Sequence, residues 1–356
     1  MTPVSIAAVG DIMLGDSPQV FGYGVASAIR SDGGPRLFDA VGKSLREADL
    51  TVANLEIVLS RTPAGARFSD RIYRGDPGVA PALRSAGIDV VSVCTNHTMQ
   101  HGAAAFAEFV ACLRDAGLMV AGADMPTLGV SRQVRCERQG VRIAVLAYNF
   151  RPIQYTAAPP AWPVPDVSLI LGDIEEARGQ ADVIMVSLHW GDEFISYPSP
   201  WQVSTARTLV DAGAAIVVGH HPHIVQGVEL YRGGVIAYSL GNFVFDQWQP
   251  RLRRSMILHL TVYDPRHIEY RIEPVFIDER YRPVPCAGRQ LDEELAYHQA
   301  LGQLIGHCDD RTYRSDLAAR YREFRHEITV HYLTKAWKMK PADLLANVSE
   351  IIRRRL

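Results

Sequence analysis

Short apolar runs alternate along the chain with segments of helical periodicity. Runs rich in valine, isoleucine and alanine predict strands, and they lie at 4–10, 49–54, 88–94, 142–148, 181–190, 214–220 and 234–240. Helical patterns separate several of them, at 35–48, 103–117 and 201–213. The strands are continuously apolar, which indicates sheets covered on both faces. We therefore expect an α/β fold in which a β sandwich or mixed sheets are flanked by helices.

The pattern changes after two further predicted strands, at 253–263 and 268–278. From Leu291 onward the chain is charged and has helical periodicity, with aromatic residues spread along it. We therefore divide the chain into a core of residues 1–284 and a C-terminal helical extension of residues 285–356. The extension is our candidate for gripping a substrate, although its aromatic residues are also suited simply to pack it onto the core.

Polar side chains gather where several of the predicted strands end. Such positions carry the reactive groups in layered α/β folds, because strand ends meet at one edge. The clusters are GDIMLGD with Asp11 and Asp16, NLEIVLS with Asn54 and Glu56, CTNHTMQHG with Asn96 and His97, SLHWGDE with His189, Asp192 and Glu193, and GHHPH with His220, His221 and His223.

Together these clusters supply carboxylate, amide and imidazole donors without a thiolate. Such a set suits a divalent ion such as Mn, Fe, Zn, Mg or Ca. Any one of these residues alone is equally well explained as a helix cap or turn former. The three histidines of GHHPH are harder to explain in that way, because burying all of them requires partners for their ring nitrogens.

Composition limits the classes of function. The 356 residues carry a formal charge of −2, which provides no general attraction to nucleic acid or to anionic lipid. The five cysteines are odd in number and lack C-x-x-C spacing, so we expect reduced thiols and a cytoplasmic protein. We expect neither a secretion signal nor a membrane anchor, because no apolar segment approaches the roughly 18 residues of a membrane span.

The order GD, NLE, NH, HWG, GHHPH and YSLGNFVFD resembles the CapA branch of the calcineurin-like metallophosphatases. Members of this branch are also described as capsule or poly-γ-glutamate biosynthesis proteins. The resemblance runs from about residue 5 to about residue 265 and includes IYRGDP and DAGAAIVVGHHPH. It implies a four-layer αββα sandwich with a metal site at the loop edge.

The resemblance also implies roles for individual residues. His97 matches an acid/base group, His220 is the surplus histidine suited to a supporting role, and Asp246 lies in the motif SLGNFVFD beside Asn242, where its carboxylate is suited to orient an imidazole. The implied metal ligands are Asp11, Glu56, Asn96, His189, His221 and His223. The candidate catalytic residues are His97, Asp11, His189, Asp246 and His221.

Three positions depart from the wider pattern. Met13 stands where the superfamily has a histidine ligand, and Glu56 replaces the usual bridging aspartate. A thioether is a poor ligand for a hard ion, so we expect one divalent ion rather than two, with Ca, Mn, Mg and Zn not distinguished. Gln100 replaces a common aspartate near His97, which leaves the protonation state of that histidine open.

Three functions compete. Soluble members of the branch include lasso-peptide epimerases, and epimerisation at Cα needs a base, an acid and a nearby cation, which this set of residues provides. The first expectation is therefore a metal-dependent epimerase with a peptide substrate and no nucleic-acid or membrane partner. The alternatives are a metallophosphoesterase in which His97 protonates the leaving group, and a cytoplasmic capsule-related CapA protein. A binding module with a degraded site is disfavoured because the clusters are intact, and the oligomeric state is open.

Overall fold

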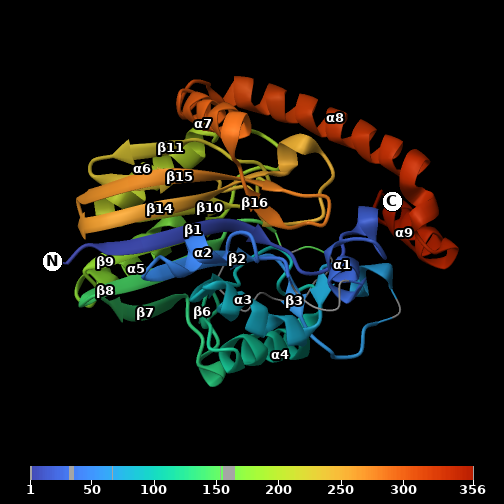
Figure 1. The fold of residues 1–356 in the computed structure, drawn as a ribbon, viewed down its shortest axis with the longest axis horizontal. Coiled ribbons are helices and arrows are strands. Elements are labelled where there is room, and N and C mark those ends of the chain that lie inside the picture. Colours follow the sequence, from blue (N-terminus) through green and yellow to red (C-terminus); the bar gives the residue numbers. More distant parts are fainter. Residues whose placement is uncertain (1, 32–35, 66, 153, 155–164, 356) are drawn as a thin grey trace.

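Two β-sheets pack face to face in the computed structural model, which describes residues 2–31, 36–65, 67–152, 154 and 165–355 (Figure 1). The first sheet has the order β16-β15-β14-β1-β2-β5-β6, with β13 pairing with β1. Its strands are β1 (Val4–Ile12), β2 (Leu50–Leu55), β5 (Val90–Ser92), β6 (Met119–Ala121), β13 (Asn242–Val244), β14 (Arg254–Asp264), β15 (His267–Ile277) and β16 (Pro283–Pro285).

The second sheet has the order β11-β12-β10-β9-β8-β7. Its strands are β7 (Gln133–Arg138), β8 (Val141–Asn149), β9 (Val183–His189), β10 (Ile216–His220), β11 (Val228–Tyr231) and β12 (Gly234–Ala237), and a small separate pair is formed by β3 (Val58–Leu59) and β4 (Arg74–Gly75). The apolar side chains between the two sheets, such as Val52, Val145 and Leu258, are fully or almost fully buried. This central layer explains why the strands are apolar on both faces.

Helices cover the outer face of each sheet. The first sheet carries α2 (Gly42–Arg46), α3 (Ala80–Ala86) and α4 (Gly102–Asp115), and Phe106 and Phe109 of α4 pack into its outer core. The second carries α5 (Val167–Arg178) and α6 (Pro200–Ala212), which bury Ile170 and Leu209. The four-layer αββα order expected from the resemblance is therefore confirmed.

The C-terminal helices are α7 (Gly288–Gly302), α8 (Asp310–Lys335) and α9 (Pro341–Arg355). Figure 1 shows them along one end of the sandwich, with α9 near α1 (Val25–Ser31). Phe324 of α8 stacks on Phe194 of the core at 3.9 Å between ring centroids. In α9, Asp343 forms an ion pair with Arg71. The helical extension predicted from the sequence is confirmed and is held against the core at several points, while the division at residue 285 stays a prediction.

One predicted helix is much shorter than expected. The pattern at 35–48 predicts a continuous helix, but only Gly42–Arg46 is helical. The carbonyl of Phe38 accepts hydrogen bonds from the amides of both Val41 and Gly42, at 3.1 and 2.7 Å, which closes a tight turn. This turn buries Leu37 and Phe38 in the core, so tertiary packing overrides the local helical pattern.

Two smaller expectations concern membranes and thiols. Within the residues that the structure describes, every helix is too short or too polar to cross a bilayer. All five cysteines are free thiols, as their scattered positions predicted.

Candidate metal centre

The predicted donor residues meet where the two sheets come together. Asp11 lies near the end of β1, Glu56 directly follows β2 and Asn96 follows β5, all in the first sheet. His189 ends β9, and the GHHPH segment begins within β10, which ends at His220, in the second sheet. Because these strands are parallel to their neighbours, their carboxyl ends bring the side chains to one edge. All six predicted ligands are at most 4 % exposed.

Glycine makes the close approach of these segments possible. A Cβ on Gly10 would lie 2.0 Å from the carbonyl oxygen of Gly241, and one on Gly219 would lie 1.9 Å from that of Tyr238. Either contact is far inside van der Waals range, so a side chain there would push apart the strands that carry the donors.

Asp11 is held as a carboxylate by its neighbours. Its Oδ1 accepts a hydrogen bond from Asn54 at 2.9 Å and lies 3.2 Å from Nδ1 of His220, and its Oδ2 accepts the amide of His221 at 3.1 Å. Burial raises the pKa of Asp11, but the His220 hydrogen bond and the attraction of His220 and His223 outweigh it, so that the pKa is lowered overall. His220 thus lies beside the proposed ligand Asp11, and its supporting role stays a prediction.

Among the proposed donors, Glu56 is the one whose negative charge is stabilised least by its surroundings. It is completely buried, and neither carboxylate oxygen accepts a hydrogen bond from any described residue. Its Oε1 lies 3.8 Å from Nε2 of His97, 3.8 Å from Nε2 of His189 and 3.6 Å from Nε2 of His223. Burial, followed by the charges of Asp11 and Glu193, raises its pKa well above the usual range. An unpartnered buried carboxylate is expensive, so this position calls for a cation.

Two histidines that come from the second sheet, His189 and His221, are held neutral. Burial and the neighbouring imidazoles lower the pKa of His189 and of His221 well below the usual range. Nε2 of His189 lies 2.9 Å from Oδ1 of Asn96, while both ring nitrogens of His221 are without a hydrogen-bond partner among the described residues. Neutral imidazole is the form that binds metal ions.

The donor atoms fall into two groups that share Glu56. One consists of Glu56, His221 and His223, and the other of Asp11, Glu56 and His189; within each group the ligand atoms lie within 4.8 Å of one another. The orphaned oxygens of Glu56 and the unpartnered nitrogens of His221 make these residues a good fit for a divalent ion. His221 and His223 also adopt positive φ angles of 93° and 58°, a backbone strain typical of functional loops.

His97 has a defined tautomer in this hydrogen-bond network. Its Nδ1 lies 3.0 Å from Oε1 of Gln100, and Nε2 of Gln100 donates to the carbonyl of Ser69 at 2.6 Å. The Gln100 oxygen can therefore only accept, so Nδ1 of a neutral His97 carries the proton and Nε2, the atom facing Glu56, carries the lone pair. Tyr73 stacks on the imidazole at 3.8 Å and fixes its plane.

The imidazole-orienting role predicted for Asp246 is taken by Asn242. Oδ2 of Asp246 accepts the amide of Ser17 at 2.9 Å, and the carboxyl group lines a separate cavity. In contrast, Oδ1 of Asn242 lies 3.0 Å from Nδ1 of His223, and its Nδ2 donates to the carbonyl of the same residue. The prediction was wrong about the residue, because the Asp246 carboxylate accepts the Ser17 amide instead of contacting an imidazole among the described residues.

Other site residues were missed or misjudged. Asn54 was noted only as a strand-end residue, yet it bonds to Asp11, and nothing in the local sequence indicated the stacking of Tyr73. Asp192 of the SLHWGDE cluster is engaged by Arg151 at 3.3 Å and by Tyr313 of α8 at 3.3 Å. Met13 is fully buried, and its sulfur accepts a hydrogen bond from the amide of Gly15 at 3.2 Å.

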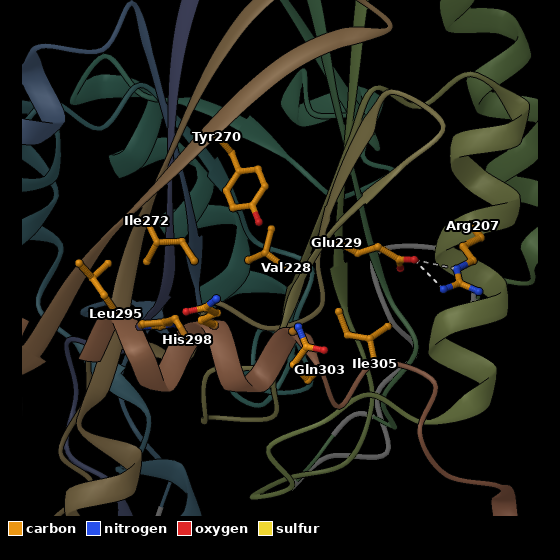
Figure 2. A pocket seen from close by; sticks show the side chains of 11 residues that line it. Arg207, Val228, Glu229, Tyr270, Ile272, Leu295, His298, Gln303 and Ile305 are labelled. Carbon is orange, nitrogen blue, oxygen red and sulfur yellow. Dashed lines mark hydrogen bonds and ion pairs between the residues drawn. The ribbon is translucent and has the colours of Figure 1, made fainter. Parts of the chain in front are cut away.

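A cavity of about 530 Å³ lies elsewhere, between β11, β15 and α7 (Figure 2). None of the metal-donor residues lines it. Its carboxylate, Glu229, is already bound by Arg207 at 2.6 Å and by the hydroxyl of Tyr238 at 2.7 Å. We therefore do not assign the reactive site to this cavity, despite its size.

Comparison with known proteins places these features among relatives. A family model described as "Bacterial capsule synthesis protein PGA_cap" matches residues 5–247. The chain is 31 % identical to capsule biosynthesis protein CapA of Bacillus anthracis, over 83 % of this chain and 72 % of the relative. It is 29 % identical to PGA biosynthesis protein CapA of Bacillus subtilis, over 82 % of this chain and 76 % of the relative.

A solved structure supports the fold. A candidate 5′-nucleotidase from Staphylococcus aureus, in complex with alpha-ketoglutarate, matches with a TM-score of 0.50 and 12 % identity, over 84 % of this chain and 58 % of that chain. At this identity the match shows the metallophosphatase-like architecture alone.

Proposed function

The chain belongs to the family of bacterial capsule synthesis proteins, and from that premise we propose that it is a metal-dependent acid/base enzyme that epimerises a Cα of a peptide. The substrate proposed is a ribosomal precursor peptide of the lasso type. The observation that carries the proposal is the position of His97, whose Nδ1 lies 3.0 Å from Oε1 of Gln100 and whose Nε2 lies 3.8 Å from the buried, unpartnered Glu56. A proton acceptor beside a cation site is what removal of an acidic carbon-bound proton requires.

The proposed ligands are Asp11, Glu56, Asn96, His189, His221 and His223, holding one divalent ion. When bound, such an ion supplies positive charge that stabilises negative charge on a substrate carbonyl oxygen. Met13 supports the count of one ion, because its sulfur takes the place of a nitrogen donor. The sharing of Glu56 by two donor groups is the observation that favours a second ion.

The proposed reaction moves one proton off the Cα and one proton back. Nε2 of His97 takes the proton from Cα, and the electron pair of the broken C–H bond moves into the adjacent carbonyl group. A second group then returns a proton to the opposite face of the same carbon, which inverts its configuration without breaking the peptide. We propose that this group comes from the GHHPH segment, where His220 is paired with Asp11.

A second candidate is phosphoester hydrolysis. Two donor groups that share one carboxylate resemble the arrangement that holds two ions in hydrolases. In that reaction His97 would act as the acid that protonates the leaving oxygen, so its Nε2 would have to be protonated first. A capsule-related role like that named for the two Bacillus relatives is the third candidate.

The test uses the metal-loaded full chain and any small precursor peptide that the neighbouring genes are found to encode. In D₂O the peptide should gain one deuteron at a Cα and change configuration, and it should not be cleaved. His97→Ala should slow this exchange by roughly 10²-fold or more while retaining the metal. His267→Ala, which changes an exposed histidine on the β14–β15 hairpin, is the matched control and should exchange at the wild-type rate.

Two outcomes would overturn the epimerase proposal. One is release of phosphate or a nucleotide from phosphodiesters at enzymatic rates, with no deuterium incorporated into any peptide. The other is exchange that is unaffected in His97→Ala. A cytoplasmic location and the lack of a nucleic-acid partner stay predictions from composition.

A further inference from the structure

A second polar cavity, of about 250 Å³, lies between the segment that follows β13 and the C-terminal end of α8. We call it the lysine pocket; residues that line it include Tyr23, Asp246, Trp248, His331, Lys335 and Lys338. It contains none of the proposed metal ligands. Because the core and the C-terminal helices both contribute, the pocket exists only when the extension is docked.

The lysines of this pocket stand out in the whole sequence. The chain has only four lysines, at 43, 335, 338 and 340, and the other basic residues are arginines. Lys335 and Lys338 line the pocket, and neither lies within ion-pair distance of a carboxylate in the described part of the chain.

Two of the three acidic residues of the wall are already neutralised by arginine. Asp278 forms an ion pair with Arg282 at 2.6 Å, and Glu279 forms one with Arg253 at 2.7 Å. Within each pair the two charges cancel. Lys335 and Lys338 therefore give the pocket an excess of positive charge. An anionic ligand would complete it.

Asp246 provides a buried polar group with an unused bonding position. It is 1 % exposed, its Oδ2 accepts the Ser17 amide, and its Oδ1 has no hydrogen-bond partner among the described residues. Burial, with a further contribution from the charge of Asp16, raises the pKa of Asp246 to about 7. Near neutral pH a large share of molecules therefore carry a carboxylic acid here, which can donate a hydrogen bond.

Aromatic rings form the rest of the wall. Trp248 stacks on His331 at 3.9 Å, and the hydroxyl of Tyr23 lies 3.0 Å from Nε2 of His331. Nζ of Lys338 lies 5.3 Å from the centre of the Tyr23 ring. The pocket thus offers apolar surface beside two cations and a hydrogen-bond donor, which suits a carboxylate attached to a carbon chain rather than a bare inorganic anion.

Two chain segments connect the lysine pocket to the metal centre. Asn242 bonds to His223, Phe245 packs on the His223 ring at 4.8 Å, and Asp246 follows directly in the pocket wall. The Asp246–Ser17 hydrogen bond ties this segment to the one that carries Asp11. Four residues of extended chain span at most roughly 13 Å, so a short peptide is long enough to reach from one site to the other.

We propose that the lysine pocket binds a carboxylate group of the peptide substrate, donated either by the C-terminus or by an acidic side chain. Lys335 and Lys338 supply the charge, and the Asp246 carboxyl group supplies a hydrogen bond. This inference rests on the proposed function only in taking the ligand to be a peptide, and its test measures binding without turnover.

The probes are three acetylated peptides, Ala₅-Trp with a free C-terminal carboxylate, the same peptide amidated, and an amidated version with glutamate in place of the last alanine. Binding to the full chain is measured by calorimetry at low salt. The amidated peptide should bind about tenfold more weakly than the free carboxylate, the loss typical of a charge-assisted contact. Recovery of binding with glutamate would identify a side-chain carboxylate as an accepted source.

Lys335→Gln combined with Lys338→Gln should remove the difference between charged and amidated peptides. Lys340→Gln, which removes one positive charge from the same segment but outside the pocket, should keep it. Equal binding of all three peptides to the wild-type chain, or an unchanged preference in the double variant, would overturn the inference. Glu56→Gln should retain the preference for the charged peptides. The binding result can therefore be interpreted even if the epimerase proposal fails.

Discussion

The metal centre and the lysine pocket handle charge in opposite ways. The metal centre encloses two carboxylates and several imidazoles at strand ends, where almost no water reaches them. The lysine pocket places two exposed lysines on a helix end beside one buried carboxyl group. Charges in the first site act through a medium of low polarity, whereas those in the second are screened by solvent. Changes at the metal centre should therefore have much larger effects than changes at the lysine pocket.

The largest effect is expected from Glu56→Gln. Glutamine resembles the protonated acid that the raised pKa of Glu56 favours in the metal-free protein, so the variant should fold. It cannot supply the shared carboxylate, and metal content by elemental analysis should fall at least about tenfold, as a lost first ligand implies. Glu47→Gln, on an exposed glutamate after α2, is the control. Wild-type metal content in Glu56→Gln would show that the centre does not depend on this carboxylate.

An intermediate effect is expected from Met13→His. An imidazole here would add the nitrogen donor that the thioether lacks, and titration calorimetry should show the stoichiometry rising from near one ion per chain toward two. Met13→Leu adds no donor and should leave the stoichiometry unchanged. Two equally tight ions in the wild-type chain would contradict the single-ion proposal and would favour the hydrolase reading.

The smallest effect on metal binding is expected from Asp246→Asn, whose consequence is measured instead as stability against pH. Burial raises the folded-state pKa of Asp246 to about 7, above its ordinary value of 3.8, so its contribution to stability is fully present below pH 4 and is lost as the pH rises to about 7. The asparagine variant has no titratable group at this position, so it does not lose stability in this way. Its free energy of unfolding should exceed that of the wild type by more at pH 8 than at pH 4, by an amount on the order of a few kcal/mol.

Denaturant titrations of the two proteins at pH 4, 6 and 8 provide the measurement. Parallel stability curves across this range would mean that Asp246 is solvated in the folded protein. The proposal that Asp246 donates a hydrogen bond in the lysine pocket would then fail.

The two regions also differ in how far the sequence could predict them. Strand-end residues such as Asp11, Glu56 and His189 could be found in advance, because apolar runs locate the strands and parallel pairing brings their ends together. Asp246 was placed wrongly because its position depends on how the chain turns after β13. The lysine pocket joins residues from the two ends of the chain, such as Tyr23 and Lys338, and no local pattern indicates that they meet.

The scarcity of lysine gives the protein an unusual chemical reactivity. Acylating reagents and reductive methylation modify amines and spare guanidinium groups, so the side-chain targets in this chain are only Lys43, Lys335, Lys338 and Lys340. Three of these lie within six positions at the junction of α8 and α9, and two of the three line one cavity. Mass spectrometry of the labelled chain would thus follow occupancy of that cavity directly, with Lys43 on the core and Lys340 outside the pocket as internal references.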